Sequence, residues 1–183
     1  IEENYKIKFN TEKVILFFGY IRKYKGLMYL IDAMPEILKD TNVKLLIAGE
    51  FYDDEKPYKE KIKELKLEEN IFLLSDFMPD DKVRYFFSAC DCLVLPYTDA
   101  TQSGIVQIAY YYDKPVIVTD VGGLSEVVIS EKTGIIINPG NVNEVAEAVK
   151  NITKKISKIY SRRTLKLKSL NIRGKFLWKI LRS

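Results

Sequence analysis

Short apolar runs alternate with amphipathic segments along this chain of 183 residues, and the alternation restricts the folds open to it. The run of residues 14–18 lacks the polar–apolar alternation of a half-exposed strand and predicts a strand buried on both faces, and the run of residues 43–48 predicts a second buried strand. The expected strands cover residues 14–18, 43–48, 71–74, 92–95, 115–119 and 134–137. The expected helices cover residues 27–38, 58–67, 80–90, 103–112 and 145–159, and Pro35 should kink or restart the first of them. Strict alternation with short connections predicts an α/β fold, a Rossmann-like, doubly wound parallel sheet with helices on both faces.

The charge is divided between two parts of the chain. Residues 1–147 contain 17 Lys and Arg against 25 Asp and Glu, a net charge of −8. Residues 148–183 contain 12 Lys and Arg and no acidic residue, a net charge of +12. An acidic body repels a phosphate backbone outside a local pocket, so we do not expect a nucleic-acid partner.

Three absences exclude further classes of protein. The chain has no histidine, which removes Ser-His-Asp, Cys-His and His-metal chemistry within it. Its two cysteines, Cys90 and Cys92, are too few for a disulfide framework and indicate a reducing compartment, where we expect them to fill the core. No apolar run approaches the ~20 residues that span a bilayer. We therefore expect a cytoplasmic protein.

Ligands of doubly wound sheets bind at the carboxyl ends of the strands, so we expect a ligand site among the loops that follow the strands. The loop of residues 19–26 leaves the first strand at Gly19 and places Lys25 and Gly26 at the start of a helix. A cation and an accessible backbone at a helix N-terminus suit an anion such as a diphosphate. A solvated basic loop remains the alternative. The loop is neither GxGxxG nor a Walker loop, which disfavours dinucleotide and ordinary NTPase functions.

A second loop, residues 96–105, follows the strand that ends at Leu95. Small polar residues lead into a helix that should begin at Ser103 or Gly104, whose free amides would face a phosphate together with the Ser103 hydroxyl. Simple N-capping by Thr101 or Ser103 is the alternative.

Two glycines, Gly122 and Gly123, precede Glu126 in a third loop. Paired glycines allow the backbone to approach a ligand or a neighbouring loop closely, although an ordinary turn would need them too. The acidic groups Asp53-Asp54-Glu55 and Asp80-Asp81 read as loops and helix N-caps rather than metal sites, and we expect no metal.

In order and spacing, these segments resemble the nucleotide-binding half of group 1 glycosyltransferases (family 4, GT-B architecture). The resemblance covers roughly residues 13–150. The matching stretches are FFGYIRKYKGLMYLIDAM, KLLIAGE, ACDCLVLPY, TQSGIVQIAYYYDKPVIVTDVGGLSEVV and TGIIINPGNVNEVAEAV. The resemblance implies a retaining, metal-independent transfer from a nucleotide-diphosphate sugar, which is a substrate, so that no cofactor is expected.

The resemblance also implies roles for individual residues. Lys25 matches the family's diphosphate-binding lysine. Arg22 lies two residues beyond the family's usual arginine position, Tyr20 here, and is our candidate for a second diphosphate cation. We expect both cations to be catalytic, because fixed positive charge stabilises the leaving phosphate. Phe77 and Met78 fall where the family shapes the base pocket. The remaining donor-binding candidates are Gly19, Thr101, Ser103, Gly104, Ile105 and Gln107.

One departure weakens the match. The family usually has two glutamates eight residues apart around this helix start, and those positions fall near Ala100 or Thr101 and at Gln107 or Ile108. None is acidic, and Asp99 or Gln107 would replace the pair only in part. Contacts with the donor sugar and the ribose are therefore in doubt.

The resemblance divides the chain into three parts. Residues 1–12 should be a linker from a missing N-terminal lobe, residues 13–160 the nucleotide-sugar-binding domain, and residues 161–183 a basic tail. We expect the acceptor, a glycan or a lipid, to bind through the missing lobe, and the isolated chain to be inactive. The alternatives are a non-catalytic α/β partner-binding module and a fragment of a GT-B-type sugar-nucleotide epimerase.

The tail has three readings. The residues from Leu165 to Ile172 predict an extended or irregular connector, and those from Lys175 to Arg182 predict a short amphipathic helix. This helix could dock on the missing lobe or contact an anionic membrane at the inner face. An aberrant reading frame at the end of the gene would also explain the loss of every acidic residue.

Overall fold

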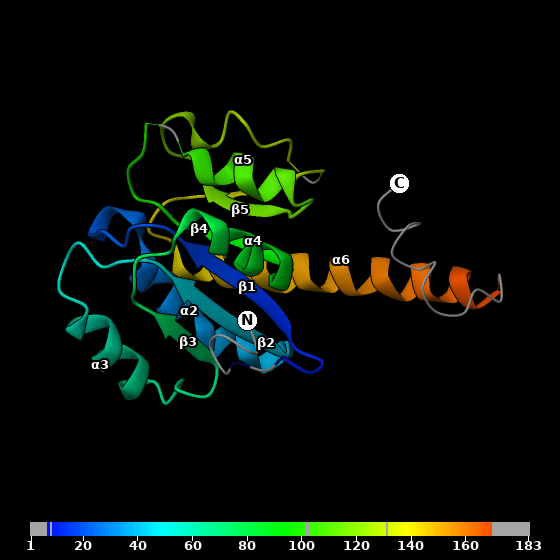
Figure 1. The fold of residues 1–183 in the computed structure, drawn as a ribbon, viewed down its shortest axis with the longest axis horizontal. Coiled ribbons are helices and arrows are strands. Elements are labelled where there is room, and N and C mark those ends of the chain that lie inside the picture. The colour runs from blue at the N-terminus through cyan, green and yellow to red at the C-terminus, as the bar shows by residue number, and fades with distance from the viewer. Residues whose placement is uncertain (1–6, 8, 102, 131, 170–183) are drawn as a thin grey trace.

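A six-stranded parallel sheet forms the centre of the computed structural model, which describes residues 7, 9–101, 103–130 and 132–169, with side chains to residue 156 (Figure 1). The strand order is β3-β2-β1-β4-β5-β6. The strands are β1 (Lys13–Phe18), β2 (Val43–Ala48), β3 (Ile71–Leu74), β4 (Cys92–Leu95), β5 (Val116–Thr119) and β6 (Gly134–Ile137). The helices are η1 (Lys23–Lys25), α2 (Leu27–Asp40), α3 (Lys56–Glu64), α4 (Asp80–Ala89), α5 (Gly104–Tyr111), η2 (Gly122–Leu124) and α6 (Val142–Ser169). The expected α/β, doubly wound sheet is therefore confirmed.

The chain reverses its direction of winding between β1 and β4. The first three strands are added outward from β1, and the chain then returns through α4 to place β4 on the other side of β1, with Ile15 beside Cys92. In open sheets of this kind, ligands bind beyond the carboxyl ends of the strands at this switch point. The loops that follow β1 and β4 are therefore brought side by side.

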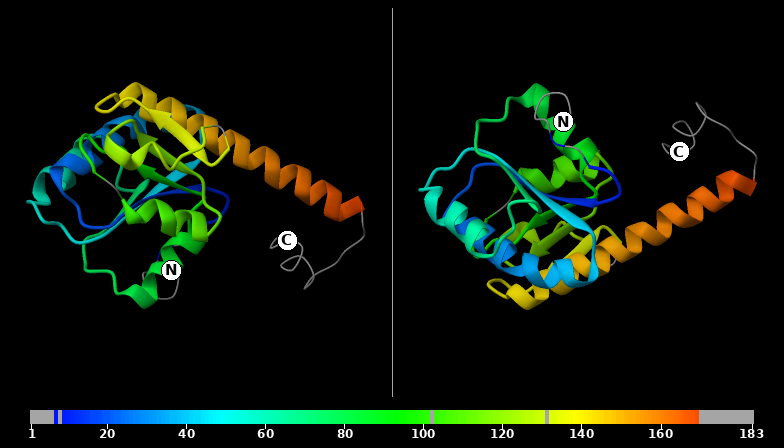
Figure 2. Two further views of the ribbon diagram at one scale, coloured as in Figure 1. Left: turned by 90° about the horizontal axis from the view of Figure 1, so that it is seen from above. Right: turned by 90° about the horizontal axis from the view of Figure 1, so that it is seen from below.

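Helices cover both faces of the sheet (Figure 2), and an apolar layer of side chains lies beneath them on each face. One layer packs α2, α3 and α6 against residues such as Phe17, Leu45 and Ile117. The other packs α4 and α5 against Leu16, Leu46 and Val118. Successive residues of each strand enter opposite layers, which explains why the strands read as unbroken apolar runs.

Helix α2 excludes one of the two effects expected of Pro35. It continues through Pro35 to Asp40 and does not restart there. Proline removes one backbone hydrogen bond and crowds the preceding turn. Residues on both sides of it, including Leu30, Met34 and Ile37, are fully buried, and this tertiary packing holds the helix through the proline.

Helix α6 is longer than the sequence suggested. It runs to Ser169, beyond the expected domain boundary at residue 160, and Leu165 and Leu167 are helical rather than extended. Extending an existing helix avoids the cost of nucleation, and Leu, Lys and Arg favour helices, which explains the difference. The expected amphipathic helix between Lys175 and Arg182 lies outside the described residues.

The residues before β1 pack on the sheet. Ile7 is buried, and the ring of Phe9 lies edge-on to that of Phe72, with centroids 5.6 Å apart. The described part of the expected linker is thus attached to the α4 and α5 side of the domain. Among the described helices, none combines the length and apolar character needed to cross a membrane.

Candidate functional site

The loop after β1 brings Lys25 to the switch point. Gly19, with φ +103°, lets the chain leave β1, and Gly26, with φ +67°, joins η1 to α2. Both values lie in the left-handed region that favours glycine. At Gly26 a Cβ atom would overlap the carbonyl oxygen of Pro96, so only glycine allows this contact between the loops after β1 and β4.

The loop after β4 is tied to its neighbours by hydrogen bonds. The Thr119 hydroxyl donates to the carbonyl oxygen of Tyr97 at 2.6 Å. The backbone amide of Thr98 donates to the carbonyl oxygen of Tyr24 at 2.7 Å, and the Thr98 hydroxyl donates to the same oxygen at 3.1 Å. The main chain around Tyr97 is therefore fixed on two sides.

Helix α5 begins at Gly104, as the sequence predicted. Ser103 occupies the N-cap position with extended backbone, yet its side chain makes no capping hydrogen bond. The first amides of a helix have no acceptor within it, so they remain free to bind a ligand. A Cβ atom at Gly104 would meet nothing within 4 Å, which shows that this helix end faces open space.

The paired glycines support the second loop. The Gly123 amide donates to the carbonyl oxygen of Thr101 at 2.8 Å, and a Cβ atom at Gly122 would overlap the carbonyl oxygen of Ala100. The sequence left open whether the glycines approach a ligand or a neighbouring loop, and in the structure they approach the neighbouring loop.

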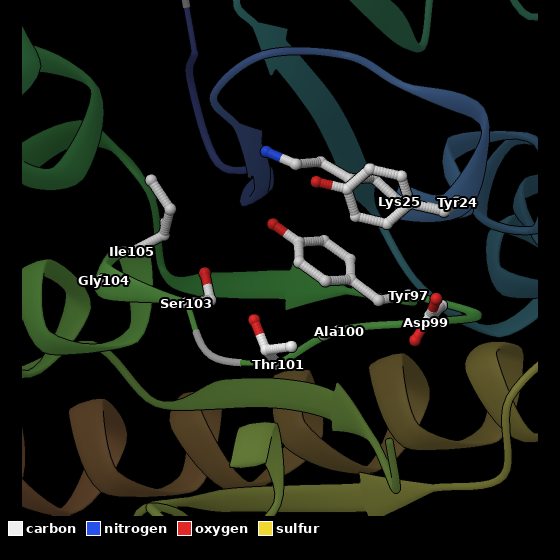
Figure 3. A pocket seen from close by; sticks show the side chains of 9 residues that line it. All are labelled: Tyr24, Lys25, Tyr97, Asp99, Ala100, Thr101, Ser103, Gly104 and Ile105. Carbon is white, nitrogen blue, oxygen red and sulfur yellow. The ribbon is translucent and has the colours of Figure 1, made fainter. Parts of the chain in front are cut away.

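A pocket of about 430 Å³ lies where these loops meet (Figure 3). Lys25, the hydroxyls of Tyr97 and Ser103, and the start of α5 all face its interior. Of the sequence-predicted residues, the pocket contains Lys25, Thr101, Ser103, Gly104 and Ile105. Gly19 borders the same space, because a Cβ atom there would lie 3.5 Å from Lys25 Nζ and from Ile105 Cδ1. The full lining is Tyr24, Lys25, Tyr97, Asp99, Ala100, Thr101, Ser103, Gly104 and Ile105.

The electrostatics of the pocket centre on Lys25. Burial lowers the pKa of Lys25, and the nearby Arg22 guanidinium lowers it further. No carboxylate among the described residues lies within ion-pair distance of its ammonium, which sits 5.5 Å from the centroid of the Tyr97 ring. A partly buried cation without an acidic partner is suited to hold an anionic ligand.

Four predicted site residues lie elsewhere. Arg22 is exposed and its guanidinium stacks 4.0 Å above the Tyr52 ring. Phe77 is exposed, whereas Met78 is buried in the layer beneath α4. Gln107 is exposed on α5. None of the four lines the pocket.

Sequence reasoning missed Tyr97 and Tyr24. The chain contains twelve tyrosines, and their number gave no reason to single out these two. Tyr97 is buried at 2% exposure. Its place directly after a buried strand and Pro96 was the available signal, because such a residue must lie at the carboxyl edge of the sheet.

The acidic loops and cysteines have structural roles. Asp53 Oδ2 accepts a hydrogen bond from the Lys23 amide, and Asp54 Oδ1 accepts one from the Lys56 amide. Within the described ranges, no three His, Cys, Asp or Glu side chains gather as metal ligands. Cys90 and Cys92 are free thiols buried in the core, as expected.

Comparison with known sequences places the chain in a family. A sequence profile described as glycosyl transferases group 1 matches residues 2–163. An uncharacterized glycosyltransferase of Methanocaldococcus jannaschii is 35% identical over 145 residues, which are 78% of this chain and 36% of that protein. A capsular polysaccharide biosynthesis glycosyltransferase of Staphylococcus aureus is 30% identical over 83% of this chain and 40% of its own length. The chain thus spans less than half the length of these relatives.

Solved structures share the fold. Sucrose-phosphate synthase from Thermosynechococcus elongatus superposes with a TM-score of 0.72 at 23% identity, over 80% of this chain and 37% of that one. The C-terminal domain of a group 1 family glycosyl transferase from Francisella tularensis gives 0.65 at 19% identity, over 78% of this chain and 85% of that one. Anabaena HepE, solved with UDP and glucose, gives 0.65 at 21% identity, over 86% and 48%. With the profile match over most of its length, the chain belongs to the group 1 glycosyl transferases.

Proposed function

We infer that this chain is the donor-binding domain of a glycosyltransferase and that its pocket holds the diphosphate of a nucleotide sugar. One observation carries the inference: Lys25 is partly buried, has no carboxylate partner in the described part of the chain, and faces the start of α5. A cation and a helix N-terminus directed at one space form an anion site.

The same groups provide a chemical role. When the bond between the sugar and the diphosphate breaks, negative charge grows on the leaving phosphate. Lys25 and the amides of Gly104 and Ile105 would stabilise that charge from fixed positions. We propose a metal-independent, retaining transfer, in keeping with the family resemblance, in which these donors supply the positive charge.

A structural neighbour supports a nucleotide sugar as the donor substrate. HepE was solved with UDP and glucose, which makes a uridine diphosphate sugar the first candidate. The acceptor would bind to a part of the enzyme outside this chain, because the relatives are more than twice as long as the matched region. The S. aureus relative acts in capsular polysaccharide biosynthesis, so a glycan or lipid-linked acceptor is the leading proposal.

Isothermal titration calorimetry of the chain with UDP, GDP and ADP tests the donor site. We expect at least one of the three to bind, and Lys25→Ala to weaken that binding by about tenfold or more, as for loss of a charged hydrogen bond. Failure of all three to bind at millimolar concentration would contradict the proposal.

Lys23→Ala is the matched control. Lys23 lies in the same short helix as Lys25 and carries the same charge, but it is exposed and does not line the pocket. If both variants lost affinity equally, general electrostatic attraction would explain the binding. A selective loss in Lys25→Ala supports a specific site.

A further inference from the structure

Tyr97 contains a buried hydroxyl for which the described part of the chain offers no hydrogen-bond partner. The side chain is 2% exposed, and its oxygen makes no hydrogen bond with the described residues. Burial raises the pKa of Tyr97 and the neighbouring Ser103 hydroxyl partly opposes that rise, but the two oxygens do not have the geometry of a hydrogen bond. Buried hydroxyls are nearly always paired, because an unpaired one loses its interaction with water and gains nothing.

Contacts with neighbouring residues hold the Tyr97 side chain in its position. The Tyr97 carbonyl accepts the Thr119 hydroxyl, and the Tyr97 ring lies edge-on to the Tyr24 ring, with centroids 6.1 Å apart. The ring therefore has little freedom to turn its hydroxyl toward another partner. In Figure 3 the hydroxyl is directed toward the space between Lys25 and Ser103.

The chemistry of the hydroxyl defines its ligand. Burial raises the pKa of Tyr97 to about 12, so the group stays protonated and can donate a hydrogen bond. Phosphate oxygens only accept hydrogen bonds, and the pocket already presents the Lys25 ammonium and the first amides of α5. An anionic oxygen at this position would satisfy all three donors together.

We propose that the Tyr97 hydroxyl donates a hydrogen bond to a phosphate oxygen of the nucleoside diphosphate and is a third fixed donor beside Lys25 and the start of α5. The inference rests on the proposed function, since it takes the diphosphate to occupy this pocket. It adds a specific binding residue that holds the leaving group. The unpaired hydroxyl is then a cost that the free protein carries and that the ligand removes.

Tyr97→Phe removes the hydroxyl and keeps the ring, which gives two opposite expectations. The free variant should have a melting temperature equal to or above that of the wild-type chain, because an unsatisfied buried group has been deleted. Its affinity for UDP should fall about tenfold or more, while uridine, which has no phosphate, should bind both proteins equally. A group with a purely structural role would instead lower the melting temperature.

The measurements are calorimetric titrations with UDP, GDP, ADP and uridine, together with melting curves without ligand. Tyr111→Phe is the control, since Tyr111 is 81% exposed and lies outside the pocket. A wild-type chain that binds no diphosphate overturns the proposed function and this inference with it. If the wild-type chain binds UDP and Tyr97→Phe binds it equally tightly, the inference alone is overturned. A Tyr97→Phe chain that unfolds also overturns it, because the hydroxyl would then be needed by the free fold.

Discussion

Gly26 lies directly against the carbonyl oxygen of Pro96, so that the loop after β1 and the loop after β4 touch through their main chains. In Gly26→Ala the added methyl group would overlap the Pro96 carbonyl oxygen, and alanine would have to adopt a φ of +67°. We expect the free energy of unfolding to fall by at least about 2 kcal/mol, because the strained backbone and the overlap act together. Urea denaturation followed by circular dichroism measures this loss.

Gly104→Ala is the counterpart of that experiment. A Cβ atom there meets nothing within 4 Å, and alanine favours helices over glycine, so stability should change by less than about 1 kcal/mol. Equal losses in the two variants would mean that the contact with Pro96 is not what requires glycine at residue 26.

Gly122 supports the pocket from outside. Its Cβ position coincides with the Ala100 carbonyl oxygen, so Gly122→Ala should push the segment from Ala100 to Thr101 toward the pocket. We expect the affinity for UDP to fall by about tenfold, because a small displacement of binding groups removes well-aligned hydrogen bonds. Calorimetric titration measures it.

Gly140→Ala separates displacement from strain. Gly140 has φ +73°, but an added Cβ would meet only the phenolic oxygen and Cζ of Tyr29, at 3.8 Å and 3.9 Å. The backbone strain is therefore similar in both variants, while only Gly122→Ala moves a loop of the pocket. UDP affinity that falls equally in both would refute this role for Gly122.

The cysteines should be unreactive while the protein is folded. Burial raises the pKa of Cys90 to about 12 and also raises that of Cys92, and the thiolate is the reactive form of the side chain. We expect a thiol reagent such as DTNB to label neither residue of the native chain at mildly alkaline pH, and both in guanidinium. Rapid labelling of the native chain would show that the core around β4 opens.

The strands and the helix starts could be predicted because their signals are local. Each strand is an apolar run that both layers of the core require, and glycine marks the backbone at Gly19 and Gly26 where φ is positive. Whether α2 restarts at Pro35 could not be decided from the sequence, because packing against the sheet, rather than the proline, holds the helix together.

The details of the site depend on contacts between distant segments. Arg22 was expected in the pocket, but Ile21 pairs with Phe51 and is fully buried, which turns its neighbour Arg22 outward to the Tyr52 ring. The unpaired hydroxyl of Tyr97 was equally hidden, because it depends on the contacts that Tyr97 makes with Tyr24 in the loop after β1 and with Thr119 at the end of β5. Lys25 was found because its neighbour Gly26 marks the turn that holds it.

Lys150 joins α6 to α2 and makes the fold sensitive to acid. Its ammonium is buried and lies 2.8 Å from Glu36 Oε1 and 2.9 Å from Asp40 Oδ2. The Lys150 hydrogen bond, followed by that of Lys39, lowers the pKa of Glu36 to about 2, and Lys150 also lowers the pKa of Asp40. The unfolded chain therefore binds more protons at acidic pH than the folded chain does, and stability must fall as the pH drops from about 4.5 toward 2.

Lys150→Met tests this linkage. The variant replaces the ammonium side chain with an apolar one of similar length and leaves Glu36 and Asp40 without their shared cation. Its melting temperature at neutral pH should therefore be several degrees lower. Its stability should also fall less steeply between about pH 4.5 and 2, since Glu36 returns toward its ordinary pKa. Urea midpoints measured across this range give the slope. Lys39→Met, which removes the exposed partner of Glu36, should change both quantities much less, and an equal change would show that burial of Lys150 contributes nothing.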